Sequence, residues 1–258
     1  MADNFIWYEL MTSDQDGAIA FYTAVVGWTA ADQTMAELDF RYTILSVGER
    51  GVGGLMALTE EMKAGGAVPG WMGVVGVADT DAEAERIAAE GGAVYMGPDD
   101  IPNVGRFAVV ADPGGAVYEI MTPLPREEEP APVARMTPGH VGWHELYAAN
   151  GEEAAFAFYS AHYGWTTADS LDMGPMGQYR IFAAGGEPIG GMMNKPADMP
   201  AGAWGFYFAV DGLDAAVERI TANGGKILMG PHEVPDGSWI VQATDPQGAN
   251  FALVSQTR

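Results

Sequence analysis

The chain contains no cysteine. A disulfide framework, thiol catalysis and thiolate metal sites are therefore excluded. Basic residues are also scarce, because 12 Lys and Arg stand against 35 Asp and Glu, for a formal net charge of −23 at pH 7. Phosphate binding needs clustered cations, so this balance argues against nucleic acid as a partner and disfavours anionic membranes.

Long apolar runs are missing as well. No stretch reaches the ~18 apolar residues of a membrane-spanning helix, and "MADNFIWYEL" at the start lacks the basic flank and long apolar stretch of a signal peptide. We therefore expect a cytoplasmic protein without a membrane span. Its 258 residues, 48% of them hydrophobic, suffice for one large domain or two of ordinary size.

Most of the sequence occurs twice. The segment 7–28, "WYELMTSDQDGAIAFYTAVVGW", returns at 143–165 as "WHELYAANGEEAAFAFYSAHYGW", and 81–102 aligns with 214–235. Proline and glutamate dominate the stretch between the copies, "PLPREEEPAPVARMTPG", which is typical of a solvated linker. We predict domains at 1–124 and 138–258, joined by a linker at 125–137.

Each copy alternates strand and helix patterns in the same order. Residues 5–12 alternate as a strand, and Ser13 or Asp14 can cap a helix that ends at Gly27. Further strands are predicted at 41–48, 51–58, 71–78, 93–97, 105–112 and 116–123, with a second helix at 81–90. Each copy is thus two βαβββ units, and the fold class is α+β with two cupped, mostly antiparallel sheets.

These motifs resemble a known family. The strand, Asp and helix leading to "FY…GW", the mid-domain "GG" and the terminal "DP.G" together resemble the vicinal oxygen chelate superfamily, in a tandem two-domain form. That family includes glyoxalases, extradiol dioxygenases and bleomycin-resistance binding proteins. The resemblance implies cupped sheets in which the first, fourth, fifth and eighth strands direct ligands at one divalent ion.

Carried onto this chain, the ligand pattern is mostly lost. In the first copy its positions fall at Trp7, in 53–58, at Met72 and at Glu119. In the second copy they fall on Trp143, within 190–193, and on Gly205 and Ala252. One carboxylate cannot hold a catalytic ion, so we expect no metal and no other cofactor.

Two glutamates recur in both copies. Glu9 and Glu145 each lie two residues after a tryptophan, on the same strand face. A carboxylate that faces a cavity could accept a substrate hydroxyl or act as a base, and it could equally tie strand ends together. Glu9, Glu119 and Glu145 are the candidate catalytic residues, and no catalytic role is assigned.

The other candidate ligand contacts are one arginine and large soft side chains. Arg106 could hold a ligand carboxylate, and it could instead pair with Glu119 or with a surface acid. Aromatic and methionine side chains on the predicted strands suit a planar or apolar ligand, although most such side chains fill cores. The predicted ligand-binding set is Trp7, Glu9, Met56, Met72, Arg106, Glu119, Trp143, Glu145, Met193 and Trp239.

The four histidines do not suggest a metal centre. His140 and His144 share the strand face opposite Trp143 and Glu145, so we expect both to point away from the cup. His162 lies on a helix and His232 in a loop.

We therefore expect a metal-free relative of the family that binds a small, partly apolar or aromatic molecule in a strand-lined cup. The alternative is a metal-dependent lyase, isomerase or dioxygenase with an unusual site around Glu119, so whether the protein is an enzyme stays open. A scaffold without a ligand is a third reading. We expect either a monomer with pseudo-dimeric domains or a homodimer.

Overall fold

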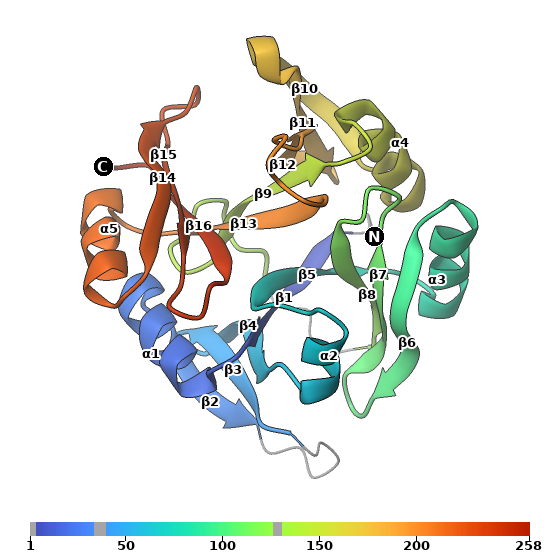
Figure 1. Ribbon diagram of the computed structural model, residues 1–258, viewed down its shortest axis with the longest axis horizontal. Helices are drawn as coiled ribbons and strands as arrows, with labels where there is room; N and C mark the ends of the chain where they lie inside the picture. The colour runs from blue at the N-terminus through green and yellow to red at the C-terminus, as the bar shows by residue number, and fades with distance from the viewer. Residues whose placement is uncertain (1–3, 34–39, 126–130) are drawn as a thin grey trace. The chain divides into compact units, whose positions relative to one another are not determined.

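The computed structural model describes residues 4–33, 40–125 and 131–258 (Figure 1). Residues 126–130 of the predicted linker lie outside this description. Within the described ranges, no helix is long and apolar enough to cross a membrane.

The described residues form four βαβββ modules in succession. Module 1 comprises β1 (Phe5–Thr12), α1 (Gln15–Val26), β2 (Thr29–Gln33), β3 (Tyr42–Val47) and β4 (Arg50–Ala57). Module 2 comprises β5 (Gly70–Gly76), α3 (Thr80–Ala89), β6 (Ala93–Ile101), β7 (Gly105–Ala111) and β8 (Val117–Pro123). Module 3 comprises β9 (Val141–Ala148), α4 (Glu152–Tyr163), β10 (Thr166–Asp172), β11 (Gln178–Ala184) and β12 (Glu187–Asn194). Module 4 comprises β13 (Ala203–Ala209), α5 (Leu213–Ala222), β14 (Lys226–Glu233), β15 (Trp239–Thr244) and β16 (Asn250–Ser255).

The strands are hydrogen-bonded into two mixed sheets. One has the order β2-β3-β4-β1-β5-β8-β7-β6, and the other repeats it as β10-β11-β12-β9-β13-β16-β15-β14. Within each module the first and last strands pair in parallel, as in β1 with β4, and the remaining neighbours pair antiparallel. The predicted α+β class with duplicated βαβββ units is confirmed.

The modules pack as two compact units that do not follow chain order. Among the described residues, unit 1 contains 4–6, 72–125, 131 and 144–205, and therefore most of modules 2 and 3. Unit 2 contains 7–33, 40–71, 132–143 and 206–258, and therefore most of modules 1 and 4. Each unit thus combines one module from each copy of the repeat.

Local sequence signals fix the helix ends. The Asp14 side chain accepts a hydrogen bond from Gly17 N at 3.1 Å and starts α1, and Gly27, with φ 89°, ends it. Asp79 caps α3 in the same way, through Ala82 N at 3.0 Å. In addition, a short helix that the sequence pattern did not predict, α2 (Glu60–Ala64), lies between β4 and β5.

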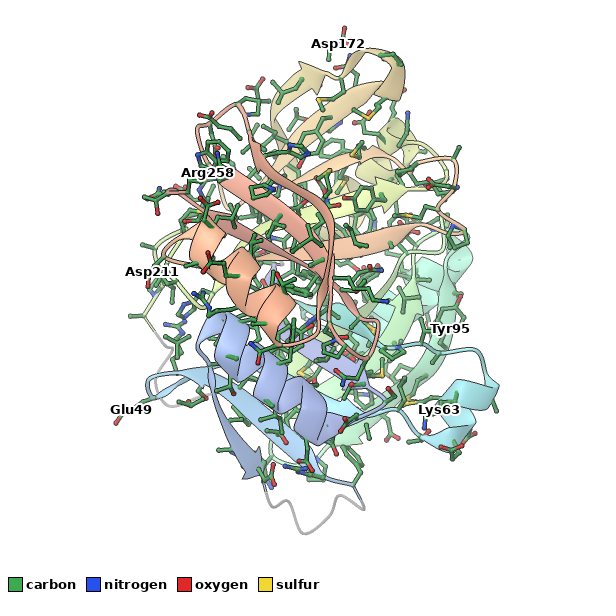
Figure 2. All side chains as sticks on the ribbon, turned by 60° about the vertical axis from the view of Figure 1, so that its left-hand side comes forward. Glu49, Lys63, Tyr95, Asp172, Asp211 and Arg258 are labelled. Carbon is green, nitrogen blue, oxygen red and sulfur yellow. The ribbon has the colours of Figure 1, made fainter. Side chains whose placement is uncertain are left out.

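The same arginine contact joins two helices in each unit. In unit 2, where α1 and α5 lie side by side (Figures 1 and 2), the Arg219 guanidinium donates to Val25 O at 2.9 Å. In unit 1, Arg86 of α3 donates to Ala161 O of α4 at 3.0 Å. A cation at the last turn of a helix satisfies a carbonyl that has no partner within the helix.

The repeated motifs meet inside each unit. In unit 1, the Tyr159 hydroxyl of "FY…GW" donates to Asp112 Oδ2 of "DPGG" at 3.1 Å, and Trp204 Nε1 donates to that hydroxyl at 2.9 Å. All three side chains are buried. Asp112 also accepts from Gly114 N and Ala116 N, which closes the turn.

Unit 2 repeats this network with residues from the opposite copies. The Tyr22 hydroxyl donates to Asp245 Oδ2 at 3.2 Å and accepts from Trp71 Nε1 at 2.9 Å. The tyrosine comes from the first copy and the aspartate from the second. The repeated motifs therefore hold modules of different copies together.

Candidate functional site

One face of module 1 combines apolar side chains with a buried carboxyl. Residues on the face that packs toward α1 are fully buried, including Leu10, Leu45 and Leu55. The opposite face is only half-buried around a buried carboxyl. We call this opposite surface the glutamate face and define it by Trp7, Glu9, Met11, Tyr42, Ile44 and Met56.

Strand register brings these side chains together. Glu9 of β1 lies opposite Gly54 of β4, and Tyr42 of β3 lies opposite Met56 of the same strand. Because side chains alternate along a strand, Trp7 and Glu9 project from the same face. The result is a strand-lined surface with one carboxyl among aromatic and thioether groups.

A chain of two hydrogen bonds runs from Trp7 through Tyr42 to Glu9. Trp7 Nε1 donates to the Tyr42 hydroxyl at 3.0 Å, and that hydroxyl donates to Glu9 Oε1 at 2.5 Å. The other oxygen, Glu9 Oε2, is buried and has no hydrogen-bond partner among the residues described. An unpaired buried oxygen is costly, so such atoms are rare outside functional sites.

Burial changes the acid strength of this group. The Glu9 side chain is 8% exposed, and desolvation raises its pKa from 4.5 to about 7, against the opposing effects of the Tyr42 hydroxyl and the Trp7 indole. The carboxyl therefore carries a proton in a large fraction of molecules at neutral pH. It can act there either as a hydrogen-bond donor or as a proton acceptor.

The corresponding network in module 3 is closed. Glu145 Oε1 accepts from the Tyr179 hydroxyl at 3.0 Å, and Oε2 accepts from the Tyr147 hydroxyl at 2.5 Å. Tyr179 matches Tyr42 in the repeat, whereas the place of Tyr147 is taken by Met11 in module 1. One substitution thus separates a carboxyl bonded at both oxygens from one that is bonded at a single oxygen.

A glycine on the neighbouring strand makes room for each pair. A Cβ at Gly54 would clash with the Tyr42 hydroxyl and lie 2.5 Å from Glu9 Oε2. A Cβ at Gly191 would clash with the Tyr179 ring in the same way. The "GG" of both copies therefore allows the tyrosine and the glutamate to lie over the strand.

The residues at the expected metal-ligand positions of the first copy are Trp7, the segment 53–58, Met72 and Glu119, and of these only Glu119 carries a donor group suited to a divalent ion. Within residues 4–33, 40–125 and 131–258, no cluster of three or more His, Asp or Glu could hold a metal ion. The donor set at these positions does not fit the divalent ion that the fold implies.

Unit 1 contains five of the predicted ligand contacts, and three of them are Glu119, Met72 and Met193. Glu119 is 8% exposed, and its backbone pairs with Val74 of β5 and Val109 of β7. Met72 is 5% exposed, and Met193 pairs with Tyr147 across β12 and β9.

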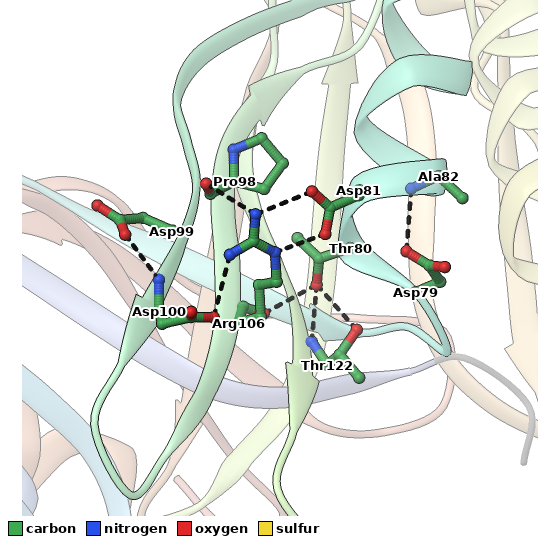
Figure 3. Close-up of polar contacts among 9 residues, drawn as sticks. All are labelled: Asp79, Thr80, Asp81, Ala82, Pro98, Asp99, Asp100, Arg106 and Thr122. Carbon is green, nitrogen blue, oxygen red and sulfur yellow. Dashed lines mark hydrogen bonds and ion pairs between the residues drawn. The ribbon is translucent and has the colours of Figure 1, made fainter.

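Arg106 lies in a surface ion cluster (Figure 3). Its guanidinium contacts Asp81 Oδ2 at 2.5 Å and Asp100 Oδ1 at 3.0 Å, and it also donates to Pro98 O at 3.2 Å. Two guanidinium nitrogens of Arg106 donate to the two carboxylate oxygens of Asp81, and this contact lowers the pKa of Asp81. The surface-acid pairing considered for Arg106 is thus present, with Asp81 and Asp100 as its partners.

The two remaining tryptophans of the predicted set each contact an arginine. Trp143 lies 5.7 Å below the Arg135 guanidinium and packs with Met136 against the buried cluster around Tyr207. Trp239 lies 5.1 Å from the guanidinium of Arg258.

The histidines form separate contacts. The His144 ring stacks on Phe5 at 4.4 Å, and burial lowers its pKa to about 4, although the Ile189 carbonyl opposes this. His162, whose side chain is fully buried, contacts Glu83 at 2.5 Å and Glu90 at 3.1 Å. The sequence pattern gave no sign of this His162 cluster, because its members lie far apart in the chain.

Tyr42 is the residue of the candidate site that the sequence pattern does not single out. Its hydroxyl contacts Glu9 Oε1, yet the pattern places it only within a strand. A usable signal existed, because Tyr42 and Tyr179 occupy matching places in the two copies, each before a "GG" strand.

Comparison with known proteins agrees with this architecture. The family model described as Glyoxalase/Bleomycin resistance protein/Dioxygenase superfamily matches residues 4–120 and again 137–253. The chain belongs to this superfamily. The two matched regions are the two copies of the repeat, so the superfamily fold is present in tandem.

Two curated relatives match nearly the whole chain. The chain is 30% identical to "Putative glyoxylase CFP32" of Mycobacterium tuberculosis, over 96% of this chain and 93% of that protein. It is also 30% identical to "Anthracycline biosynthesis protein DnrV" of Streptomyces peucetius, over 96% and 91% of the two chains. Among solved structures, the 2,3-dioxygenase LapB from Pseudomonas sp. KL28 has a TM-score of 0.66 and 12% identity, covering 100% of this chain and 94% of that one. That last likeness shows the fold alone.

Proposed function

We propose that this superfamily member binds a small, planar, partly apolar molecule on the glutamate face, without the help of a metal ion. The observation that supports the proposal is the buried carboxyl of Glu9, whose Oε2 has no partner among the described residues and lies on a face of half-buried apolar side chains. Ligand sites commonly combine mostly apolar walls with a few polar groups that fix orientation. The likeness to a protein named for anthracycline biosynthesis is consistent with a ligand of this kind.

The apolar walls provide the larger part of the expected affinity. Trp7 presents an indole next to Glu9, and a Cβ at Gly51 would lie 3.0 Å from its Cη2 atom, so the ring lies over that strand. Met11 and Met56 are paired across β1 and β4 and add polarisable thioethers. A flat apolar ligand can stack on the indole, and its polar edge reaches Glu9 Oε2 once a neighbouring side chain moves, because that atom is buried.

Ligand binding can be measured through tryptophan fluorescence. A panel of neutral bicyclic aromatic molecules should quench the emission of the purified chain, and Trp7→Leu should weaken the tightest binder by about tenfold, because it removes the stacking surface. Trp7→Tyr is the matched control, because it removes the same fluorophore and keeps an aromatic ring for stacking. The proposal fails if no member of the panel binds the wild-type chain.

The metal-dependent alternative needs its own test. Elemental analysis of protein purified without chelator should find no transition ion at the level of one per chain. One tightly held ion per chain that disappears in Glu119→Ala would instead favour a lyase, isomerase or dioxygenase with an unusual site.

A further inference from the structure

We propose that Glu9 binds its ligand as a carboxylic acid and donates the proton on Oε2 to a carbonyl oxygen of the ligand. This inference rests on the proposed function and names the chemistry of the ligand, a planar molecule that carries a carbonyl group. Binding would then be coupled to the protonation state of one side chain, and the matched carboxyl of Glu145 would have no such role.

The direction of the hydrogen bonds places the proton. A tyrosine hydroxyl has one proton to give. The Tyr42 hydroxyl receives the Trp7 indole N–H and gives its own proton to Glu9 Oε1. With Oε1 accepting this bond, we assign the proton of the neutral carboxyl to Oε2, the oxygen that has no partner among the described residues.

The surroundings favour the neutral acid. The other ionisable side chains on this face of module 1 are Tyr42 of β3 and Arg50 of β4. Gly54 lies opposite Glu9, and the backbone of Arg50 is four residues away from Gly54, roughly 13 Å along β4. Burial raises the pKa of Glu9 to about 7.

Module 4, the other part of unit 2, adds few charges. Its corresponding face carries Tyr207, whose hydroxyl accepts from Gln242 Nε2 at 2.7 Å. Lys226 and His232 lie on the edge strand β14, opposite Thr244 and Ile240 of β15, and both side chains are exposed. Exposed charges are strongly screened by water and salt, so they do little to hold a buried carboxyl in its ionised form.

In the second copy, the matching carboxyl of Glu145 accepts hydrogen bonds at both of its oxygens. Each Glu145 oxygen accepts a tyrosine hydroxyl, so the ionised form has donors at both ends. Glu9 has a donor at one end only. The difference arises because Met11 stands where the second copy has Tyr147.

A pair of probes tests the hydrogen bond. Menadione (2-methyl-1,4-naphthoquinone) is planar and neutral, offers only carbonyl acceptors and has no acid group that titrates between pH 5 and 9. The chain has no cysteine, so this quinone cannot alkylate a thiol. The matched probe, 2-methylnaphthalene, has the same skeleton without the carbonyl groups.

The expected result is a difference in pH dependence. Affinity for menadione should be constant below pH 7 and should fall by about tenfold for each pH unit above it, because only the protonated Glu9 donates. Affinity for 2-methylnaphthalene should not change over the same range. In Glu9→Gln, the amide N–H takes the place of the proton on Oε2, so menadione should bind with a pH-independent affinity.

A measurement on the wild-type chain alone covers the case of a variant that does not fold. At pH 8, calorimetry in buffers of different ionisation enthalpy should show the uptake of nearly one proton for each menadione bound, and none for 2-methylnaphthalene. Glu145→Gln should retain the pH dependence for menadione.

The outcomes separate this inference from the proposed function. If both probes bind with pH-independent affinity and no proton uptake, the proton-donor role of Glu9 is wrong while the binding face stands. If the pH dependence persists in Glu9→Gln, another group is responsible and the inference is overturned. If neither probe binds, the proposed function fails together with the inference.

Discussion

Replacing Glu9 by glutamine should stabilise the folded chain above neutral pH. In the wild type the folded-state pKa, about 7, lies above the unfolded-state value of 4.5. The stabilising effect of the protonated group is therefore fully present below pH 4.5 and is lost as pH rises through 7. The difference between the two pKa values, at about 1.36 kcal/mol for each pH unit, gives ~3 kcal/mol. Glutamine cannot ionise and avoids this loss.

Urea unfolding at several pH values between 4.5 and 8.5 measures the effect. The free energies of unfolding of wild type and Glu9→Gln should agree within about 1 kcal/mol at pH 4.5 and diverge by ~3 kcal/mol at pH 8, with the variant more stable. Glu145→Gln is the matched comparison in the second copy. Because its amide cannot accept from both tyrosines, we expect it to be less stable by about 1–3 kcal/mol at every pH.

A stability difference between wild type and Glu9→Gln that does not change with pH would refute the reasoning. If the stabilities of wild type and Glu9→Gln differ by the same amount at pH 4.5 and pH 8.5, then Glu9 ionises normally in the folded chain. Burial would not be controlling its protonation, and the proton on Oε2 would be absent at neutral pH.

Three further substitutions probe the packing around the site. Met11→Tyr should give Glu9 the second phenol donor that Glu145 has, so its pKa should fall and the pH dependence of stability should flatten; an unchanged urea profile would contradict this. Gly54→Ala should cost about 1–3 kcal/mol in urea unfolding, because the new methyl group clashes with the Tyr42 hydroxyl; wild-type stability would show that the strand can shift. Tyr159→Phe should lower the free energy of unfolding in urea by about 1–3 kcal/mol, because Asp112 loses a buried donor, and no loss would mean that the tyrosine is dispensable.

The repeat was sufficient to predict the four βαβββ modules and the α+β class. Asp14 and Gly27 marked the ends of the first helix because capping and positive φ depend on local residue type. The short helix α2 was missed, since five residues with no buried side chain leave no apolar periodicity to detect.

The partners of the repeated motifs could not be predicted from either copy alone. Tyr22 contacts Asp245, and Tyr159 contacts Asp112, so in each pair the tyrosine and the aspartate come from different copies. Sequence order suggests that a motif closes within its own copy. Which module packs on which is decided by the tertiary fold, and local patterns carry no information about it.

Only part of the candidate site could be predicted from the sequence. Glu9 stood out because it recurs as Glu145 beside a tryptophan. Its difference from Glu145 depends on which side chains reach each oxygen, and this follows from the register of β1, β3 and β4. Met11 and Tyr147 looked like an ordinary substitution on a strand until their neighbours were known.

Infrared spectroscopy of the carboxyl groups tests the central claim most directly. The difference spectrum between wild type and Glu9→Gln at pH 6 should contain the carbonyl stretch of one protonated carboxylic acid, which should disappear above pH 8 and shift in frequency when menadione binds. If that band is absent at pH 6, or if menadione binds without moving it, Glu9 is not the proton donor to a ligand.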